Sequence, residues 1–448
     1  MEITNRNKFK SIIAFLFPAI VIFGNYSFGE VRVFGLVLTI GRVLIPLICL
    51  YLISDGLRTK EKIISAMCSK EGVLLIMLAA WVIYAAITIV VMPYADLHNG
   101  VLEMIALVLG AMTVVNIVIL CRGGNWYNIM AGLRMALLIT LIIGIYEIAT
   151  GNHLSTSRLC DPEIIRLNKE LLGDKADTFR WYVATSIFYN ENDYSAMLAV
   201  FAPMLVCGQH QSKKWLWGLD LFIVCLCFAI IYFNNAFICF VAFILGLIIT
   251  IIFGFNNIKD RLIVIGSIAV SRVAVYFLEK AMELRLAWSA TILAQIDNSL
   301  NGSGSLAYRI NTYKMALTET FLTSKGMGFG AGSFTKYFGQ FAESHKMMSN
   351  PHCFWIEILS EYGVIILFLF AGVLLFIMSG LITILRQYRD TRCVAIIASG
   401  VSLIFASASP STYLKCAYFW IPIAFAVYLA DLYEVHTADK VNHYYKPE

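Results

Sequence analysis

The chain has 448 residues, of which 59% are hydrophobic and 14% are charged, and its mean hydropathy is +0.76. These values exclude an ordinary soluble protein, because apolar runs of about 20 residues, the length that crosses a bilayer as a helix, recur throughout. The formal net charge of +5 belongs to loops between such runs and does not indicate a nucleic-acid partner.

Taken in chain order, the hydropathy pattern predicts an all-α polytopic membrane protein that forms one membrane domain, residues 1–448. Basic residues precede the first apolar run without a small-residue cleavage site, so we interpret that run as an anchor. The pattern predicts about twelve spans, near 11–29, 33–54, 72–92, 100–121, 127–150, 188–207, 215–233, 235–255, 262–279, 353–379, 393–408 and 414–434.

Basic residues gather in alternate loops. One set of loops carries many Lys and Arg residues, whereas the short loops of the other set carry only Arg32 and Lys415. The positive-inside rule therefore predicts that both termini are cytoplasmic. It also predicts that two long polar segments, an outer loop at 151–187 and a large outer loop at 280–352, face outward.

The first outer loop ends in a polar cluster that runs into the sixth span. This cluster includes Arg180, Asn190 and Asn192. Polar groups at the mouth of a span must be hydrated or paired inside the protein. The cluster is therefore either an interfacial turn with helix caps or part of a binding site.

The second outer loop is expected to contain amphipathic helices. Leu306, Ile310, Tyr313, Leu317 and Phe321 recur at helical spacing and form one apolar stripe. Arg309 flanks this stripe, where its guanidinium could reach headgroups or bind a phosphate.

A glycine run, Gly326 to Gly332, follows this helix. Its alternating glycines, Gly328 and Gly330 among them, could direct backbone N–H groups at an anion, or they could form a plain turn. No strand precedes the run, so a dinucleotide-binding fold is not predicted.

The start of the following span contains a candidate base. Asn350 is suited to cap a helix and Pro351 to its first turn, which would place His352 near the positive end of the helix dipole. That position favours a neutral imidazole, the form that a general base needs. At helical spacing Gly363 lies about 20° around the axis from His352, where it would allow close packing beneath the ring. The alternative is a solvated histidine without a catalytic role.

Two glutamates lie on another face of the same helix. Glu357 and Glu361 are four residues apart, and acidic side chains inside a span are candidates for function. The scattered cysteines form no Cys-x-x-Cys pair and predict neither a metal site nor a disulfide framework.

Together these residues resemble the O-antigen ligase and Wzy-type polymerase superfamily. The resemblance rests on Ser305…Arg309…Tyr313, on Gly326-x-Gly328-x-Gly330 with Phe334, on His352 with Gly363 eleven residues later, and on Arg180 followed by Phe188-Tyr189-Asn190-Glu191-Asn192-Asp193. Two positions depart from the family pattern: Cys353 follows the histidine, and Glu191 replaces a proline. The resemblance is greatest to teichuronic acid polymerases of Gram-positive bacteria. It rests on the segment Ala184-Thr185-Ser186-Ile187-Phe188-Tyr189-Asn190.

The resemblance implies a metal-independent, inverting glycosyltransferase with a GT-C-like fold and no cofactor, active at the outer face of the bacterial cytoplasmic membrane. Its donor would be a glycan on undecaprenyl pyrophosphate, and its acceptor a sugar hydroxyl on another lipid-linked glycan. A chain-length regulator and a flippase are further expected partners. His352 would be the catalytic base, and Arg180 and Arg309 would hold the pyrophosphate. The remaining expected roles are substrate binding for Asn190, Asn192, Glu357 and Glu361, and structural support for Gly328, Gly330 and Gly363.

Three other interpretations remain open from the sequence. An O-antigen-type ligase would differ from a polymerase only in its acceptor. A polysaccharide transporter would also explain many spans and the intramembrane charges Arg42, Glu103, Arg134 and Arg272. A non-enzymatic assembly partner would need none of the residues around His352. An enzyme requires Arg180, Arg309 and His352 to meet around one cavity.

Overall fold

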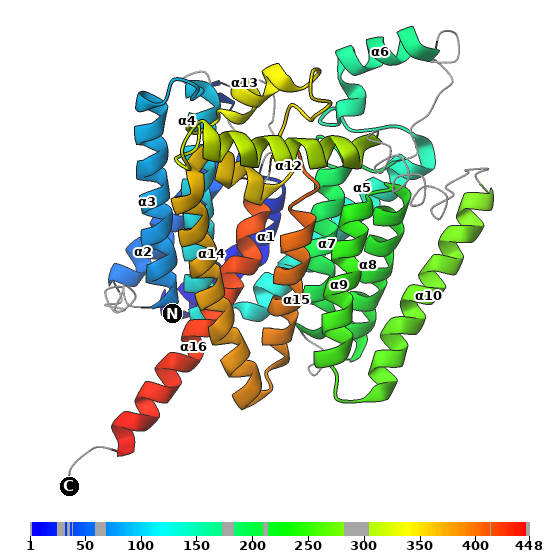
Figure 1. The fold of residues 1–448 in the computed structure, drawn as a ribbon. Helices are drawn as coiled ribbons and strands as arrows, with labels where there is room; N and C mark the ends of the chain where they lie inside the picture. The colour runs from blue at the N-terminus through cyan, green and yellow to red at the C-terminus, as the bar shows by residue number, and fades with distance from the viewer. Residues whose placement is uncertain are drawn as a thin grey trace.

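The computed structural model describes residues 2–24, 32–33, 36–37, 39–58, 69–172, 183–208, 214–281, 304–412 and 414–444. Its long helices run side by side as a bundle (Figure 1). They are α1 (Glu2–Ile22), α2 (Ile40–Arg58), α3 (Lys70–Val91), α4 (Leu97–Arg122), α5 (Trp126–Thr150), α7 (Glu191–Gly208), α8 (Lys214–Phe233), α9 (Phe237–Phe253), α10 (Ile258–Ala281), α14 (Phe354–Tyr388), α15 (Thr391–Ala406) and α16 (Trp420–Tyr444).

Shorter elements lie mostly at one end of the bundle, drawn uppermost in Figure 1. There α12 crosses the bundle, and α6 and α13 lie above it. These elements are η2 (Arg158–Cys160), α6 (Pro162–Leu172), α12 (Gly304–Leu322), α13 (Phe334–Phe338), η4 (Gly339–Phe341) and η5 (Ala417–Phe419), with the antiparallel pair β1 (Arg32–Val33) and β2 (Leu36–Val37).

A helix occupies the position of each of the twelve predicted spans. Six of these helices are both long and apolar enough to cross a membrane: α3, α4, α5, α8, α10 and α14. Helices α9 and α15 are apolar but shorter. The prediction of a helical membrane protein is confirmed at this level, whereas the count of twelve spans and the outward side of the loops stay predictions.

Polar contacts between helices supplement the apolar packing of the bundle. Arg134 on α5 and Asp220 on α8 form a bidentate ion pair at 2.5 and 2.9 Å, and both side chains are buried. At the lower end of the bundle, Asp431 on α16 accepts hydrogen bonds from the backbone N–H groups of Lys70 (2.9 Å) and Glu71 (3.3 Å). A carboxylate from one helix thus caps the positive end of another.

Helix α14 is interrupted at Gly363, whose φ of 79° and ψ of −177° are not helical. The interruption separates the N–H of Val364 from the carbonyl oxygen of Ser360, which an intact helix would join by a hydrogen bond. The glycine run supplies a partner for each of them instead. The N–H of Val364 donates to Gly326 O (2.9 Å), and the N–H of Phe329 donates to Ser360 O (2.8 Å). The glycine run is therefore joined to α14 by backbone hydrogen bonds.

Two buried carboxylates complete this junction. The N–H of Gly332 lies 3.0 Å from Glu103 Oε2 and 3.1 Å from Glu361 Oε2, and the N–H of Phe334 donates to Glu361 Oε1 at 3.0 Å. The hydroxyl of Tyr362 donates to Glu103 Oε2 at 2.7 Å. The groups that accept from the N–H groups of Gly332 and Phe334 are thus the protein's own glutamate side chains.

We predict that Gly363→Ala destabilises the protein by about 1–3 kcal/mol, because its backbone conformation is essentially restricted to glycine. An added Cβ would also lie 2.4 Å from Gly326 O. Gly372→Ala is the matched control on the same helix, since a Cβ there meets no atom within 4 Å. Thermal unfolding in detergent should show a lower midpoint for Gly363→Ala alone; equal midpoints for the two variants would contradict the strain argument.

Candidate active site

Arg309 on α12 is a buried cation, with 7% of its surface exposed. Its Nη1 donates to the carbonyl oxygen of Ala408, and its Nη2 lies 3.4 Å from the carbonyl oxygen of Ser409. Within the described residues, no carboxylate forms an ion pair with this guanidinium. Neutral carbonyls satisfy some of its N–H groups but leave its charge uncompensated, and buried cations are normally paired with anions. The arrangement favours an anionic ligand.

His352 lies outside α14, contrary to the prediction that it occupies the first turn. The helix begins at Phe354, with Cys353 at its N-cap position, and His352 has a φ of 45°. Asn350 does not cap the helix; its Oδ1 accepts a hydrogen bond from Thr335 instead (3.1 Å). The angular relation between His352 and Gly363 that a continuous helix would give is therefore also wrong.

Three contacts fix His352. Its backbone N–H donates to Ser411 O (3.2 Å), and its carbonyl oxygen accepts from the Tyr313 hydroxyl (2.9 Å). Its ring Nδ1 lies 3.4 Å from Ser409 O. A carbonyl oxygen can only accept, so this contact favours the tautomer with the proton on Nδ1. Nε2 is then the unprotonated nitrogen and can accept a proton.

The imidazole is held neutral for a reason other than the helix dipole. Burial first, and the charge of Arg309 second, lower the pKa of His352 from 6.5 to about 4, against an opposing hydrogen bond to the Ser409 carbonyl. The unfolded chain therefore binds a proton at this residue more readily than the folded chain. This difference lowers the free energy of unfolding at acidic pH. The reduction begins below about pH 6.5 and grows as the pH falls towards 4.

A polar cavity of about 290 Å³ lies beside Arg309 and Ser409. Its other walls come from the start of α7 and the turn between α8 and α9, and include Glu191, Asn192, Asn234, Asn235 and Phe237. Amide and hydroxyl groups with one arginine are suited to bind sugar hydroxyls and phosphate oxygens. Within the described residues, no group of three or more His, Cys, Asp or Glu side chains could hold a metal ion.

The structure places the two predicted asparagines differently. Asn192 lines the cavity, and its Oδ1 accepts from the Ser409 hydroxyl at 3.3 Å. Asn190 is buried and caps α7, because its Oδ1 accepts from the N–H of Asp193 at 2.8 Å. Glu191, at the position where the family has proline, lines the cavity and also forms a bidentate pair with Arg158 (2.6 and 3.1 Å).

The predicted glutamates do not line this cavity. Glu361 is bound to the backbone of the glycine run, as described above, and Glu357 is buried and accepts a hydrogen bond from the Thr412 hydroxyl. Gly328 and Gly330 both have positive φ, and a Cβ at Gly328 would lie 2.5 Å from Glu361 O. These contacts give Glu361 and the glycines a part in the α14 junction.

Arg309 and His352 thus meet at one carbonyl, that of Ser409, whereas Arg180 lies outside the described residues. The segment after α15, residues 407–412, was not identified from the sequence as part of the site. Its only signal is a run of small polar residues between two apolar runs, Ser407-Ala408-Ser409-Pro410-Ser411-Thr412. Asn234 was also missed; it lines the cavity and bonds to the backbone of Ala184 (2.7 and 2.8 Å).

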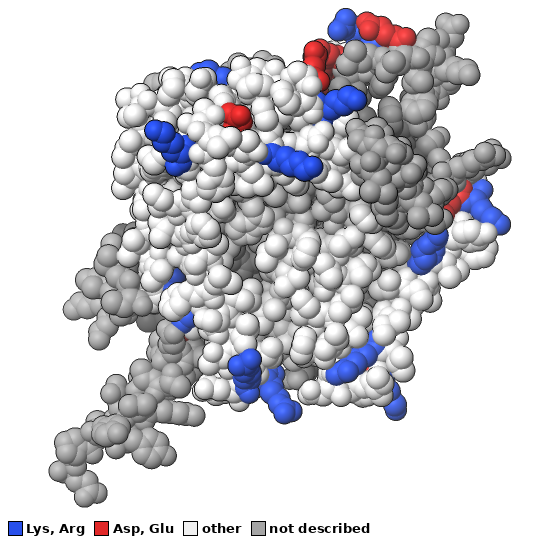
Figure 2. Space-filling view, in the orientation of Figure 1, with Lys and Arg blue, Asp and Glu red and all other residues white. Residues whose placement is uncertain are grey.

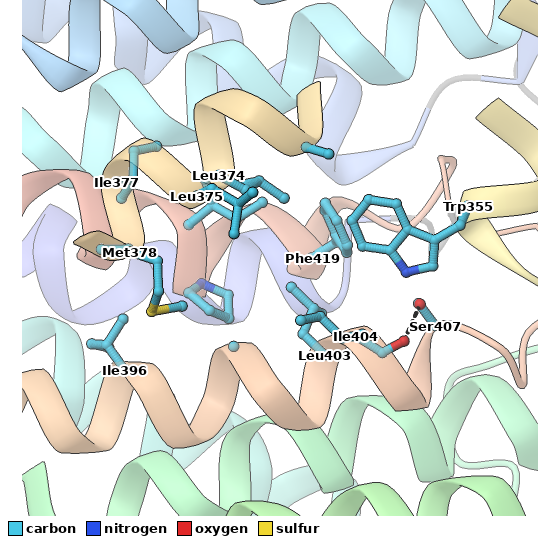
Figure 3. Close-up of a pocket in the computed structure, with 15 residues that line it drawn as sticks. Trp355, Leu374, Leu375, Ile377, Met378, Ile396, Leu403, Ile404, Ser407 and Phe419 are labelled. Carbon is cyan, nitrogen blue, oxygen red and sulfur yellow. Dashed lines mark hydrogen bonds between the residues drawn. The ribbon is translucent and has the colours of Figure 1, made fainter. Parts of the chain in front are cut away.

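An apolar groove of about 270 Å³ runs between α14, α15 and α16 (Figure 3). Trp355, Ser407 and Phe419 lie at one end of it, and Ile377, Met378 and Ile396 at the other. The end with Trp355, Ser407 and Phe419 lies next to His352. Phe354, two residues after His352, donates its N–H to Ser407 O (3.1 Å).

No protein-family model matches this chain. No curated protein sequence matches it either.

We predict that Arg309→Gln raises the pKa of His352 above about 4, because it removes the nearby positive charge. The pKa should stay below 6.5, since burial is the larger cause. Histidine-selective NMR titration in detergent can follow the ring, with His352→Ala identifying its signal. An unchanged pKa in Arg309→Gln would show that the two side chains do not interact electrostatically.

Proposed function

We propose that this chain is a membrane glycosyltransferase that polymerises oligosaccharide repeat units linked to undecaprenyl pyrophosphate. The observation that carries the proposal is the buried Arg309, which forms no ion pair within the described residues, lines a polar cavity and shares the Ser409 carbonyl with a neutral histidine. A pyrophosphate would supply the missing anion, and a sugar hydroxyl would supply the proton that the histidine accepts.

In the proposed reaction, Nε2 of His352 takes the proton of the acceptor hydroxyl while that oxygen attacks the anomeric carbon of the donor sugar. The new carbon–oxygen bond forms as the bond from the anomeric carbon to the pyrophosphate oxygen breaks. Undecaprenyl pyrophosphate leaves with the electron pair, and attack from the opposite side inverts the anomeric centre. The three guanidinium N–H groups that do not bond to Ala408 or Ser409 would stabilise the departing charge.

The apolar groove supports a lipid-linked substrate. It is lined almost wholly by apolar side chains of three helices, and its outer end lies next to the polar site. A prenyl chain in this groove would leave its pyrophosphate near the segment 407–412. Burial of the chain would be favoured by about 0.8 kcal/mol for each methylene group removed from water.

The distribution of charge supports a site on the outward side of a cytoplasmic membrane. On the face drawn in Figure 2, the lower end carries only basic side chains, the upper end carries both signs, and few charges lie between. The positive-inside rule assigns the lower end to the cytoplasm. The upper end, with α12, α13 and His352, would then face outward.

We expect His352→Ala to lower polymer formation by roughly 10²–10⁴-fold, the range of general-base assistance, without loss of folding. His345→Ala is the matched control, because His345 is exposed and outside the cluster around Ser409. The measurement is chain extension of purified lipid-linked oligosaccharide by each purified variant. Wild-type extension by His352→Ala would refute the assignment of the base.

We expect a cysteine introduced by Ser344→Cys to react in whole cells with a membrane-impermeant thiol reagent, because Ser344 is exposed at the upper end. A cysteine introduced by Lys259→Cys, exposed at the start of α10, should react only after lysis. The unmodified chain gives the background from native thiols. The reverse pattern would invert the orientation and rule out an outward-facing site.

A further inference from the structure

Helix α12 buries only part of the apolar stripe that its sequence predicts: Leu306 and Tyr313 are half-buried, whereas Ile310, Leu317 and Phe321 are exposed. The residues in contact with the bundle are Arg309, Thr312, Ala316 and Thr320, which are 7%, 0%, 0% and 0% exposed. They are three or four positions apart and therefore share one face. This face is polar or small, whereas the large apolar side chains lie to one side of it.

The apolar side is open. Ile310, Leu317 and Phe321, which share one face, are 39%, 42% and 52% exposed. Leaving such side chains in water forgoes the free energy of burying them, and contiguous patches of this kind mark an interaction surface.

The opposite side of α12 faces the elements above it. Met315 packs against the aromatic cluster that includes Phe334 and Phe338, and Glu319 Oε2 accepts from the Tyr337 hydroxyl at 2.8 Å. Asn311 bonds to the carbonyl oxygen of Lys346 (3.1 Å). Because α13 lies above α12, the apolar side points away from it, towards the uncharged band of the bundle (Figures 1 and 2).

The apolar side is also close to the exposed apolar surface of α3 and α14. Directly after α12, Gly326 is bonded to Val364 of α14, and Met327 O accepts from the Tyr84 hydroxyl of α3 (2.7 Å). Met327 is 46% exposed, and Phe368, one turn beyond Val364, is 70% exposed. Helices α3 and α14 are both long and apolar enough to cross a membrane.

We propose that α12 is an interfacial helix whose side formed by Ile310, Leu317 and Phe321 lies in the headgroup–acyl boundary of the bilayer. The leaflet is the one at the α12 end of the bundle. Lys314 is exposed next to this side, at an angle of about 60° from Leu317, where its ammonium reaches anionic lipid phosphates. This inference concerns the membrane contact and does not depend on the chemistry proposed above.

Site-specific photo-crosslinking in lipid nanodiscs tests it on the full chain. We expect p-benzoylphenylalanine at Leu317 to form phospholipid adducts, detected by mass spectrometry, at least several-fold more often than at Thr318. Both residues are exposed and adjacent, but they point about 100° apart, so Thr318 is the matched control. The same probe at Phe368, within α14, reports the yield at a lipid-facing position.

Two results would overturn the proposal. One is equal adduct formation at Leu317 and Thr318 while Phe368 gives abundant adducts, which would place the apolar side in water. The other is a covalent dimer through Leu317 in place of lipid adducts, which would show that a second copy covers this side. Substitution of Thr318 does not touch the buried face of α12, so the comparison does not depend on a folding defect.

Discussion

Backbone hydrogen bonds join the glycine run to the interrupted helix α14. These bonds position the elements on either side of the run, α12 and α13, against the bundle. Because α14 cannot complete its own hydrogen bonds around Gly363, it needs an external donor and acceptor. Phe329 and Gly326 supply them, and the side chains of Glu361 and Glu103 accept from the N–H of Gly332. This junction anchors one end of α12. The other half of α12 carries Arg309 to the segment 407–412, so the position of the arginine depends on a contact remote from it in sequence.

The candidate site is built largely from main-chain carbonyls. Ala408 and Ser409 accept from Arg309, and Ser409 also fixes the imidazole of His352. Carbonyls hold a guanidinium without neutralising it, whereas a carboxylate in the same place would remove its attraction for an anion. Burial and, second, the charge of Arg309 lower the pKa of His352 and keep its imidazole neutral. Arg309 therefore influences His352 electrostatically.

The sequence allowed prediction of the helix positions, because each long apolar run can satisfy its backbone in a membrane only as a helix. It also identified Arg309 and His352 as candidates, and the structure brings them together. The structure of the region around His352 could not be predicted from local rules. Asn350 and Pro351 have the residue types of a helix start, but the chain instead adopts a left-handed conformation at His352 that tertiary bonds to Ser411 and Tyr313 stabilise. The role of Ser409 was hidden because a carbonyl oxygen is common to every residue.

The cap that Asp431 places on α3 has a consequence for biosynthesis. The carboxylate and the N–H of Lys70 that it accepts from are separated by 361 residues, so the cap cannot form until nearly all of the chain has been made. At about 5–20 residues per second, the ribosome needs roughly 20–70 s to add that length. Throughout this interval the N–H groups of Lys70 and Glu71 lack the partner that they have in the finished protein. Helix α16, near the end of the sequence, thus completes the start of α3.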